Sequence, residues 1–264
     1  IFGLYQLYLG KHDLAFSLRQ DDNEQFGGHT TGSVSWGVEL ARNIRLTSSY
    51  GTAFKAPTFN DLYYPTGDDS LQPEESQTFE IGLSGNNKGI AWSANVYQTD
   101  IEQLIVWKEV APWVNEPTSV DEARIRGLEL AASTRISEWE VSVSLDLTDP
   151  KNLAKDLLPA QKDLLLRHPR KVFQFNADRD FGAYRLGGSL RAVGARNDET
   201  GWADTRKNVR LGGYTTVDLR GSYALGNDWS LKAKVENLLD EEYQTAYGYN
   251  QPDRTYWLSL HYAP

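Results

Sequence analysis

The sequence WEVSVSLDLT, residues 139–148, alternates apolar and polar side chains over its whole length. A period of two is typical of a β-strand that has one apolar and one polar face. The same alternation recurs upstream at residues 33–40 and 79–84, and downstream at residues 217–223 and 231–236. No segment shows a helical period over a length that would place a helix between strands. The chain is therefore predicted to be all-β.

The connections between the strands alternate in length. Short turns are expected at residues 11–13, 41–43, 86–89, 136–138, 181–183 and 225–228. Longer loops are expected at residues 21–29, 56–75, 111–121, 149–163, 197–208 and 237–253. This pattern predicts about thirteen strands that run up and down in an antiparallel meander.

Composition excludes several classes of protein and site. The chain has no Cys, so it can form neither a disulfide nor a thiolate site. Its formal net charge of −9 has the wrong sign for gripping phosphate backbones, so no nucleic acid partner is expected. No segment approaches the roughly 18–20 consecutive apolar residues of a membrane-spanning helix. The 4 His residues are scattered along the chain, and we expect neither a metal site nor a cofactor.

Two architectures fit such a meander. One is a soluble barrel or sandwich filled by the apolar faces, and the other is a transmembrane barrel whose apolar face meets lipid. Long strands, aromatic residues near strand ends, and short turns opposite long loops favour a transmembrane antiparallel up-and-down β-barrel of the bacterial outer membrane, with about 12–13 strands present. The interior is then expected to carry charges of both signs, from Arg45, Lys55, Glu80, Arg185, Arg191, Asp218, Arg220, Lys232, Lys234 and Glu236.

The strand count also gives an expectation about the whole barrel. Closed outer-membrane barrels normally have an even number of strands and keep both termini on the periplasmic side. Here the first strand runs down into a short turn and the last strand also ends at the periplasmic side, so thirteen is an odd count. We expect further strands to precede this chain. A complete twelve-stranded barrel is the alternative.

Signatures of enzymes are mostly missing, and no enzymatic activity or catalytic residue is expected. There is no nucleophile elbow and no glycine loop that would hold a phosphate. The alternative from another class is a twelve-stranded outer-membrane phospholipase, whose Ser, His and Asn lie across neighbouring strands and leave no short motif. Ser259 and His261 share one face of the last strand and would be its candidates.

Further evidence comes from four segments in a fixed order. They are SYGTAFKAP at residues 49–57, LQPE at residues 71–74, RGLE at residues 126–129 and NLLDEEY at residues 237–243. Together these segments resemble the C-terminal barrel half of TonB-dependent outer-membrane receptors. Within that family, residues 165–171, 212–219 and 247–254 are most similar to the cobalamin receptors. In RGLE the alternation changes phase, which predicts a β-bulge at that point.

The resemblance implies that residues 1–264 are the C-terminal part of a 22-stranded barrel, without the plug domain that such receptors carry. The implied function is the binding of cobalamin, or a related corrinoid, from outside the cell for TonB-coupled uptake. Its implied partners are outer-membrane lipid and lipopolysaccharide, and the TonB, ExbB and ExbD proteins through the plug. A siderophore or haem receptor of the same family is the alternative.

The resemblance also implies a ligand-binding set. Arg167 matches a receptor arginine that faces the ligand, and Tyr63 and Tyr64 fall in a loop that meets the corrinoid. Trp202 lies near the place of another aromatic residue that contacts the ligand. Pro169 interrupts the strand pattern beside Arg167, so alternation gives no direction for the arginine side chain.

Overall fold

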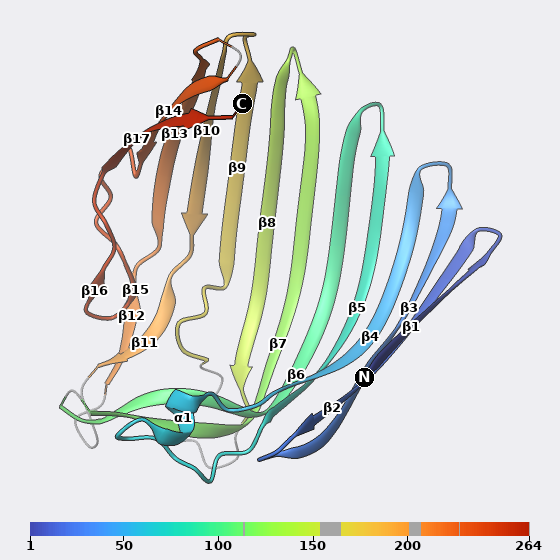
Figure 1. Cartoon of the computed structure of the whole chain (residues 1–264), viewed down its shortest axis with the longest axis vertical. Helices are drawn as coiled ribbons and strands as arrows, with labels where there is room; N and C mark the ends of the chain where they lie inside the picture. The colour runs from blue at the N-terminus through green and yellow to red at the C-terminus, as the bar shows by residue number, and fades with distance from the viewer. Residues whose placement is uncertain (113, 154–164, 201–206, 227, 264) are drawn as a thin grey trace.

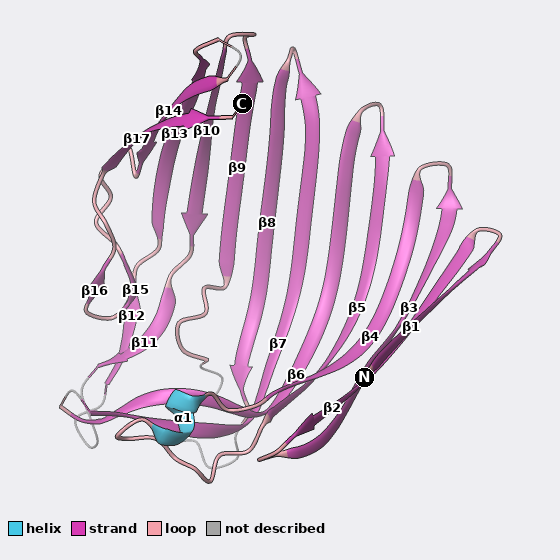
Figure 2. Ribbon diagram, viewed as in Figure 1, coloured by secondary structure: helices cyan, strands magenta, loops and turns pink. Residues whose placement is uncertain are grey.

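The computed structural model describes residues 1–112, 114–153, 165–200, 207–226 and 228–263. Strands make up nearly all of this described part, and Figure 2 shows one short helix, α1 (Phe59–Tyr63), beside them. Within these residues no helix is both long and apolar enough to pass through a membrane.

One antiparallel sheet forms the body of the protein. It contains thirteen strands in the order β1-β2-β3-β4-β5-β6-β7-β8-β9-β10-β13-β14-β17, which confirms the predicted meander. Their bounds are β1 (Phe2–Leu9), β2 (His12–Asn23), β3 (Gly27–Ala41), β4 (Ile44–Lys55), β5 (Glu74–Asn87), β6 (Ile90–Ala111), β7 (Val114–Ile136), β8 (Trp139–Asn152), β9 (Lys171–Asp180), β10 (Tyr184–Val193), β13 (Tyr214–Ala224), β14 (Trp229–Glu236) and β17 (Thr255–Tyr262).

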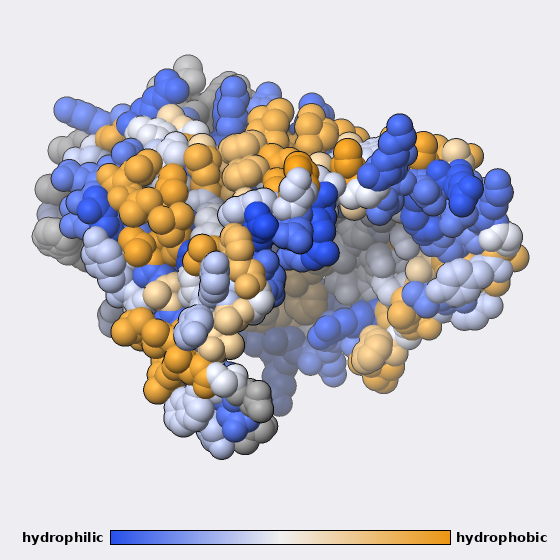
Figure 3. Space-filling model, turned by 90° about the horizontal axis from the view of Figure 1, so that it is seen from above, coloured by the Kyte–Doolittle hydropathy of each residue, from blue (hydrophilic) through white to orange (hydrophobic). Residues whose placement is uncertain are grey.

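The sheet is curved and open. β1 and β17 stand at the two ends of the strand order, and no pairing joins them within the described residues. Figure 1 shows the short turns at one end of the strands, and α1 with the long connections at the other end. Viewed along the strands in Figure 3, the wall bends around a hollow. The fold is therefore a β-barrel wall that does not close on itself.

Cross-strand register confirms the two faces that alternation predicted. Phe16, Val34, Tyr50 and Phe79 are successive partners across four strands, and each side chain is exposed. The opposite face carries polar contacts, such as the hydrogen bond of 2.7 Å between the hydroxyls of Ser17 and Ser33. An apolar outer face and a polar inner face match a barrel in lipid, and the inner face is called the lumen face below.

Three long connections contain more structure than the sequence predicted. The expected loop at residues 111–121 is wrong, because β6 and β7 pair almost to their joining turn. Pro117 is tolerated within β7 because β8 pairs only with Ala123 and the residues that follow it, which leaves the Pro on an edge. The expected loop at residues 197–208 contains β11 (Arg196–Thr200) and β12 (Lys207–Leu211), and the one at residues 237–253 contains β15 (Gln244–Ala246) and β16 (Tyr249–Asn250).

The predicted bulge in RGLE is also wrong. Residues 123–136 of β7 pair with β8 in unbroken register, and the register with β6 is unbroken there as well. Gly127 serves a different purpose. A Cβ at this position would lie 2.3 Å from Cε1 of Tyr97, its partner on β6, so the glycine makes room for the tyrosine ring.

Buried side chains are few, and most gather at the end of the long connections. A wall one strand thick buries little of itself, so enclosed apolar side chains occur mainly where connections pack on it. Leu62, Leu71, Leu165 and Leu211 are each less than 9% exposed, and all four lie in or beside long connections. This packed end, called the loop end below, positions the candidate site.

Candidate functional site

The loop end also holds the buried polar side chains of the described residues. They are Asp61, Arg196, Asp198 and Asn237, each no more than 8% exposed. Burying a charged or amide group costs free energy unless hydrogen bonds replace its contacts with water. The partners of these side chains therefore reveal how the loop end is built.

Asp61 holds α1 against the long hairpin of β6 and β7. Thr58 caps the helix and exchanges hydrogen bonds with Asp61, which accepts from the Thr58 amide at 2.7 Å and from its hydroxyl at 2.6 Å. The second carboxylate oxygen accepts from Nε1 of Trp107 on β6 at 2.8 Å. Burial alone would raise the pKa of Asp61, but the hydrogen bonds from Thr58 and Trp107 outweigh burial and hold this pKa below its ordinary value.

Tyr63 and Tyr64 lie at the C-terminal end of α1, and both rings are about half exposed. The hydroxyl of Tyr63 donates to Oε1 of Gln25, in the turn between β2 and β3, at 3.0 Å. Tyr64 meets the ring of Trp107 edge-on, with centroids 6.4 Å apart. The structure thus presents both predicted tyrosines on a helix that is fixed from two sides.

Arg167 lies in the connection from β8 to β9, with a backbone φ of 65°. Its amide donates to the carbonyl of Asn197 at 2.8 Å. Its Nε donates to Oδ1 of Asp198 at 3.1 Å, while the side chain stays 57% exposed. The structure therefore supplies the direction that alternation could not give, since the guanidinium reaches toward β11 and keeps an open face.

Asp198 is the most enclosed charged residue that the structure describes, with no exposed surface. Besides Arg167, it accepts from the amide of Glu199 at 2.9 Å and from the amide of Tyr247 at 2.7 Å. Tyr247 belongs to the hairpin of β15 and β16, so one carboxylate joins three connections.

A second cationic group lies beside this carboxylate. The guanidinium of Arg196 lies 5.4 Å from the ring centroid of Tyr214, and that ring stacks on Tyr243 with centroids 4.0 Å apart. Its Nε and Nη2 have no hydrogen-bond partner within the described parts of the chain. Burial and stacking raise the pKa of Tyr243, because the phenolate would be poorly solvated there.

The predicted ligand set forms two groups and an undescribed member. Tyr63 and Tyr64 are held by Asp61 and its partners, and Arg167 is held by Asp198. In the described structure no hydrogen bond, ion pair or ring contact joins Arg167 to either tyrosine. Trp202 lies outside the described residues.

Sequence reasoning missed the two carboxylates that hold these groups. A local signal existed for Asp61, since Thr58 and Asp61 have the spacing of a capping box. None existed for Asp198, which stands in a polar run, residues 196–200, that is typical of a solvated loop.

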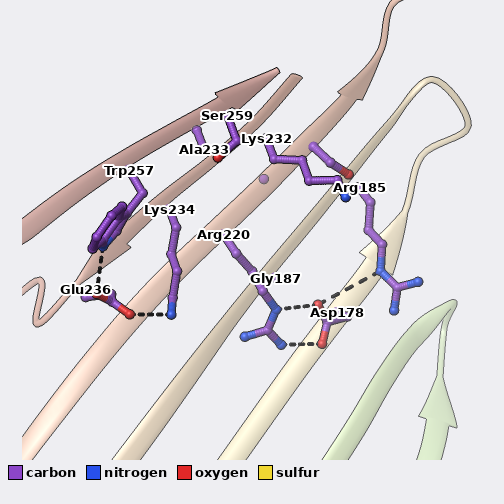
Figure 4. A pocket seen from close by; sticks show the side chains of 12 residues that line it. Asp178, Arg185, Gly187, Arg220, Lys232, Ala233, Lys234, Glu236, Trp257 and Ser259 are labelled. Carbon is purple, nitrogen blue, oxygen red and sulfur yellow. Dashed lines mark hydrogen bonds and ion pairs between the residues drawn. The ribbon is translucent and has the colours of Figure 1, made fainter. Parts of the chain in front are cut away.

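The lumen face carries a separate cavity of ≈ 720 Å³ on the strands from β9 to β17 (Figure 4). The Asp178 carboxylate forms a two-pronged ion pair with Arg220 there, and Nε1 of Trp257 donates to Glu236 at 2.7 Å. Lys232, Lys234 and Arg185 add positive charge to this lining. The interior charges that alternation predicted thus do line the lumen face at this point.

Chemistry at other places has little support. Ser259 and His261 share the lumen face of β17, but no hydrogen bond joins them in the part of the chain that the structure describes. Among the described residues, no three His, Asp or Glu side chains gather as a metal site would require.

Comparison with known proteins places the chain in a family. A family described as TonB dependent receptor-like, beta-barrel, matches residues 1–238. A curated relative, the Vitamin B12 transporter BtuB of Photobacterium profundum, is 34% identical over 253 residues, which cover 93% of this chain and 40% of the relative. The chain thus spans well under half the length of that transporter.

Solved structures agree on the fold. The copper transporter OprC superposes with a TM-score of 0.75 at 21% identity, covering 99% of this chain and 47% of OprC. The siderophore receptor PirA from Acinetobacter baumannii gives a TM-score of 0.76 at 18% identity, covering 99% of this chain and 45% of PirA. The ferric enterobactin receptor PfeA from Pseudomonas aeruginosa, a mutant solved with enterobactin, gives 0.75 at 19%, covering 99% and 44%.

These matches join the open β-barrel wall, its two faces and its packed loop end to one class of outer-membrane protein. The chain belongs to the TonB-dependent receptor-like β-barrel family of the bacterial outer membrane.

Proposed function

We propose that this chain is the C-terminal barrel part of a receptor that binds cobalamin, or a related corrinoid, at the cell surface for TonB-coupled uptake. The observation that carries this proposal is the 34% identity to a vitamin B12 transporter along 93% of the chain, long connections included. The likeness to copper and siderophore receptors is only 18–21% identical and supports the shared fold alone.

The geometry of the loop end supports a binding role. Tyr63 and Tyr64 offer half-exposed rings on a helix that is already fixed, so little conformational entropy would be lost when a large planar ligand packs on them. Arg167 offers an exposed guanidinium that could donate to an oxygen of the ligand. Trp202 stays in the proposed set on the strength of the sequence alone.

The extent of the whole receptor is part of the same proposal. Thirteen strands in an open sheet, over 40–47% of the length of the relatives, fit residues 1–264 as the C-terminal part of a 22-stranded barrel. The TonB, ExbB and ExbD proteins would then act through a plug domain that is not part of these residues. Lipid and lipopolysaccharide would surround the apolar face. The receptor would transport its ligand without making or breaking bonds in it.

Binding measurements on the intact receptor test the proposal. In detergent micelles, titration with cyanocobalamin should give saturable binding, and Arg167→Ala should weaken it about tenfold, the effect of losing one charge-assisted hydrogen bond. Arg135→Ala is the matched control, because Arg135 lies exposed beside a short turn and pairs with Glu140. Binding of a ferric catecholate in place of cyanocobalamin would favour the siderophore alternative and refute the proposal.

A further inference from the structure

Asp198 is enclosed on every side, yet it lies in a hairpin at the loop end. A carboxylate without solvent keeps its charge only where donors replace water. The structure supplies three such donors: the Nε of Arg167, the amide of Glu199 and the amide of Tyr247. Two of these donors come from other segments, 31 and 49 residues away along the chain.

The three segments meet only through long connections. Arg167 lies between β8 and β9, Asp198 lies on β11, and Tyr247 lies in the turn of the hairpin of β15 and β16. Figure 1 shows these segments on the same side of the wall, below β9, β10 and β17. Each connection would move independently if nothing joined them, since loops hold few buried contacts of their own. The carboxylate of Asp198 joins all three.

Arg167 depends on this junction more than its neighbours do. A φ of 65° is the left-handed region, which costs free energy for any side chain except that of Gly, and it persists where the surroundings determine it. Here the surroundings are β11, which accepts the backbone amide of Arg167 at Asn197 and its Nε at Asp198. Without the carboxylate, the guanidinium loses its directing partner.

The hairpin of β15 and β16 depends on the same carboxylate from the other side. It has only two pairs of partnered residues, with an irregularity between them. The amide of Tyr247 reaches Asp198 at 2.7 Å, and the exposed ring of Tyr249 follows two residues later. Arg196, on the same face of β11 as Asp198, places its guanidinium over Tyr214, so it contributes no hydrogen bond to this junction among the described residues.

We propose that Asp198 is a positioning residue: its buried carboxylate couples Arg167 to the β15–β16 hairpin, so that the guanidinium and the exposed tyrosines of the hairpin keep a fixed relation. The junction itself follows from contacts within this chain. Its effect on the ligand rests on the proposed function above.

The junction can be tested without ligand. The chain has no Cys, so Tyr249→Cys gives a single site for a spin label, with any cysteine elsewhere in the intact receptor replaced by Ser. Asp198→Asn keeps the shape of the side chain and removes its charge, and it should increase the mobility of the label. Asp240→Asn is the matched control, because Asp240 is a loop-end carboxylate that pairs with Arg254 instead. It should leave the label unchanged.

A binding cycle then tests whether Asp198 acts through Arg167. Cyanocobalamin affinity of the intact receptor is measured for Asp198→Asn, for Arg167→Ala and for the double variant, after circular dichroism and melting confirm that each is folded. Asp198→Asn alone should weaken binding about fivefold. It should have little further effect when Arg167 is already Ala, because the two changes remove one interaction.

The outcomes separate the two proposals. A mobile label in Asp198→Asn with no cyanocobalamin binding in any variant supports the junction and refutes the proposed ligand. Binding in the unaltered receptor, with an unchanged label and additive losses in the cycle, refutes the junction. If Asp198→Asn does not fold, Arg167→Ala replaces it in the label experiment, and an unchanged label then refutes the coupling.

Discussion

Arg220 on β13 pairs with Asp178 on β9, although these strands are not neighbours in the sheet. β10 lies between them, and its Gly187 is the register partner of both residues. A Cβ on Gly187 would lie 2.1 Å from Oδ1 of Asp178 and 3.0 Å from Nε of Arg220. The ion pair therefore passes directly over the glycine, and Figure 4 shows both side chains reaching toward each other across it.

Gly187→Ala should break this ion pair and lower the free energy of unfolding by about 1–3 kcal/mol, because the added methyl overpacks the contact. Thermal melting of the intact receptor in detergent measures the loss. Gly188→Ala is the control on the opposite face, where the nearest atom to the added carbon is a side-chain methyl of Leu219 at 3.3 Å. Equal melting of the two variants would show that the ion pair contributes nothing.

Gly127→Ala should destabilise the wall for a different reason. The added methyl would collide with the Tyr97 ring, at about 1–3 kcal/mol by the same overpacking effect. Tyr97→Val removes the ring, so the double variant Gly127→Ala with Tyr97→Val should be closer in stability to Tyr97→Val alone than Gly127→Ala is to the unaltered receptor. If the double variant loses as much as the two single changes together, the ring is not what requires the glycine.

The attachment of α1 should weaken in acid. The pKa of Asp61 lies below its ordinary value of 3.8, so the folded state favours the ionised form. The stabilisation is therefore fully present above pH 3.8 and is lost as the pH falls through the lowered pKa. Hydrogen-exchange protection of residues 59–64, corrected for intrinsic rates, should fall in this range.

Two variants check the origin of this pH dependence. Asp61→Asn should reduce protection at neutral pH and remove the change with acid. Asp69→Asn, at a nearby exposed position of the same connection, should preserve both. The account of Asp61 fails if Asp61→Asn still loses protection with the same pH dependence as the unaltered receptor.

Substitutions at Tyr63 should separate its ring from its hydroxyl. The ring is the proposed ligand contact, while the hydroxyl donates to Gln25. Tyr63→Phe should leave cyanocobalamin affinity within about twofold, because the exposed hydrogen bond is weak. Tyr63→Ala should weaken it about fivefold or more, because an aromatic contact is lost. Equilibrium titration decides between them, and equal affinities for the Ala and Phe variants would exclude the ring from the site.

The sequence alone predicted the wall well, for a clear physical reason. Each strand meets two different environments, so side chains such as Val34 and Phe79 repeat with a period of two and report their face directly. The extension of β6 and β7 was missed because its segments, beyond the alternating part, include Pro112 and Pro117, which are typical of loops. An edge position removes the cost of Pro117, and edges are visible only in the assembled sheet.

The candidate site was less predictable. The resemblance supplied Arg167, Tyr63 and Tyr64, but nothing local indicated what holds them. Asp198 is buried by Arg167 and Tyr247, which are distant in the chain, so its surroundings exist only after the connections pack. A polar run in the sequence cannot distinguish such a residue from a solvated one.

Uptake of labelled cyanocobalamin tests the central claim most directly. Cells that lack their own cobalamin receptor would express the complete receptor, either unaltered or with Arg167→Ala. The account predicts uptake that depends on the receptor, stops when the TonB system is absent, and falls at limiting ligand concentration for Arg167→Ala. Ferric enterobactin should not compete. Receptor-dependent import of a ferric siderophore, with no cobalamin uptake above that of cells without the receptor, would contradict it.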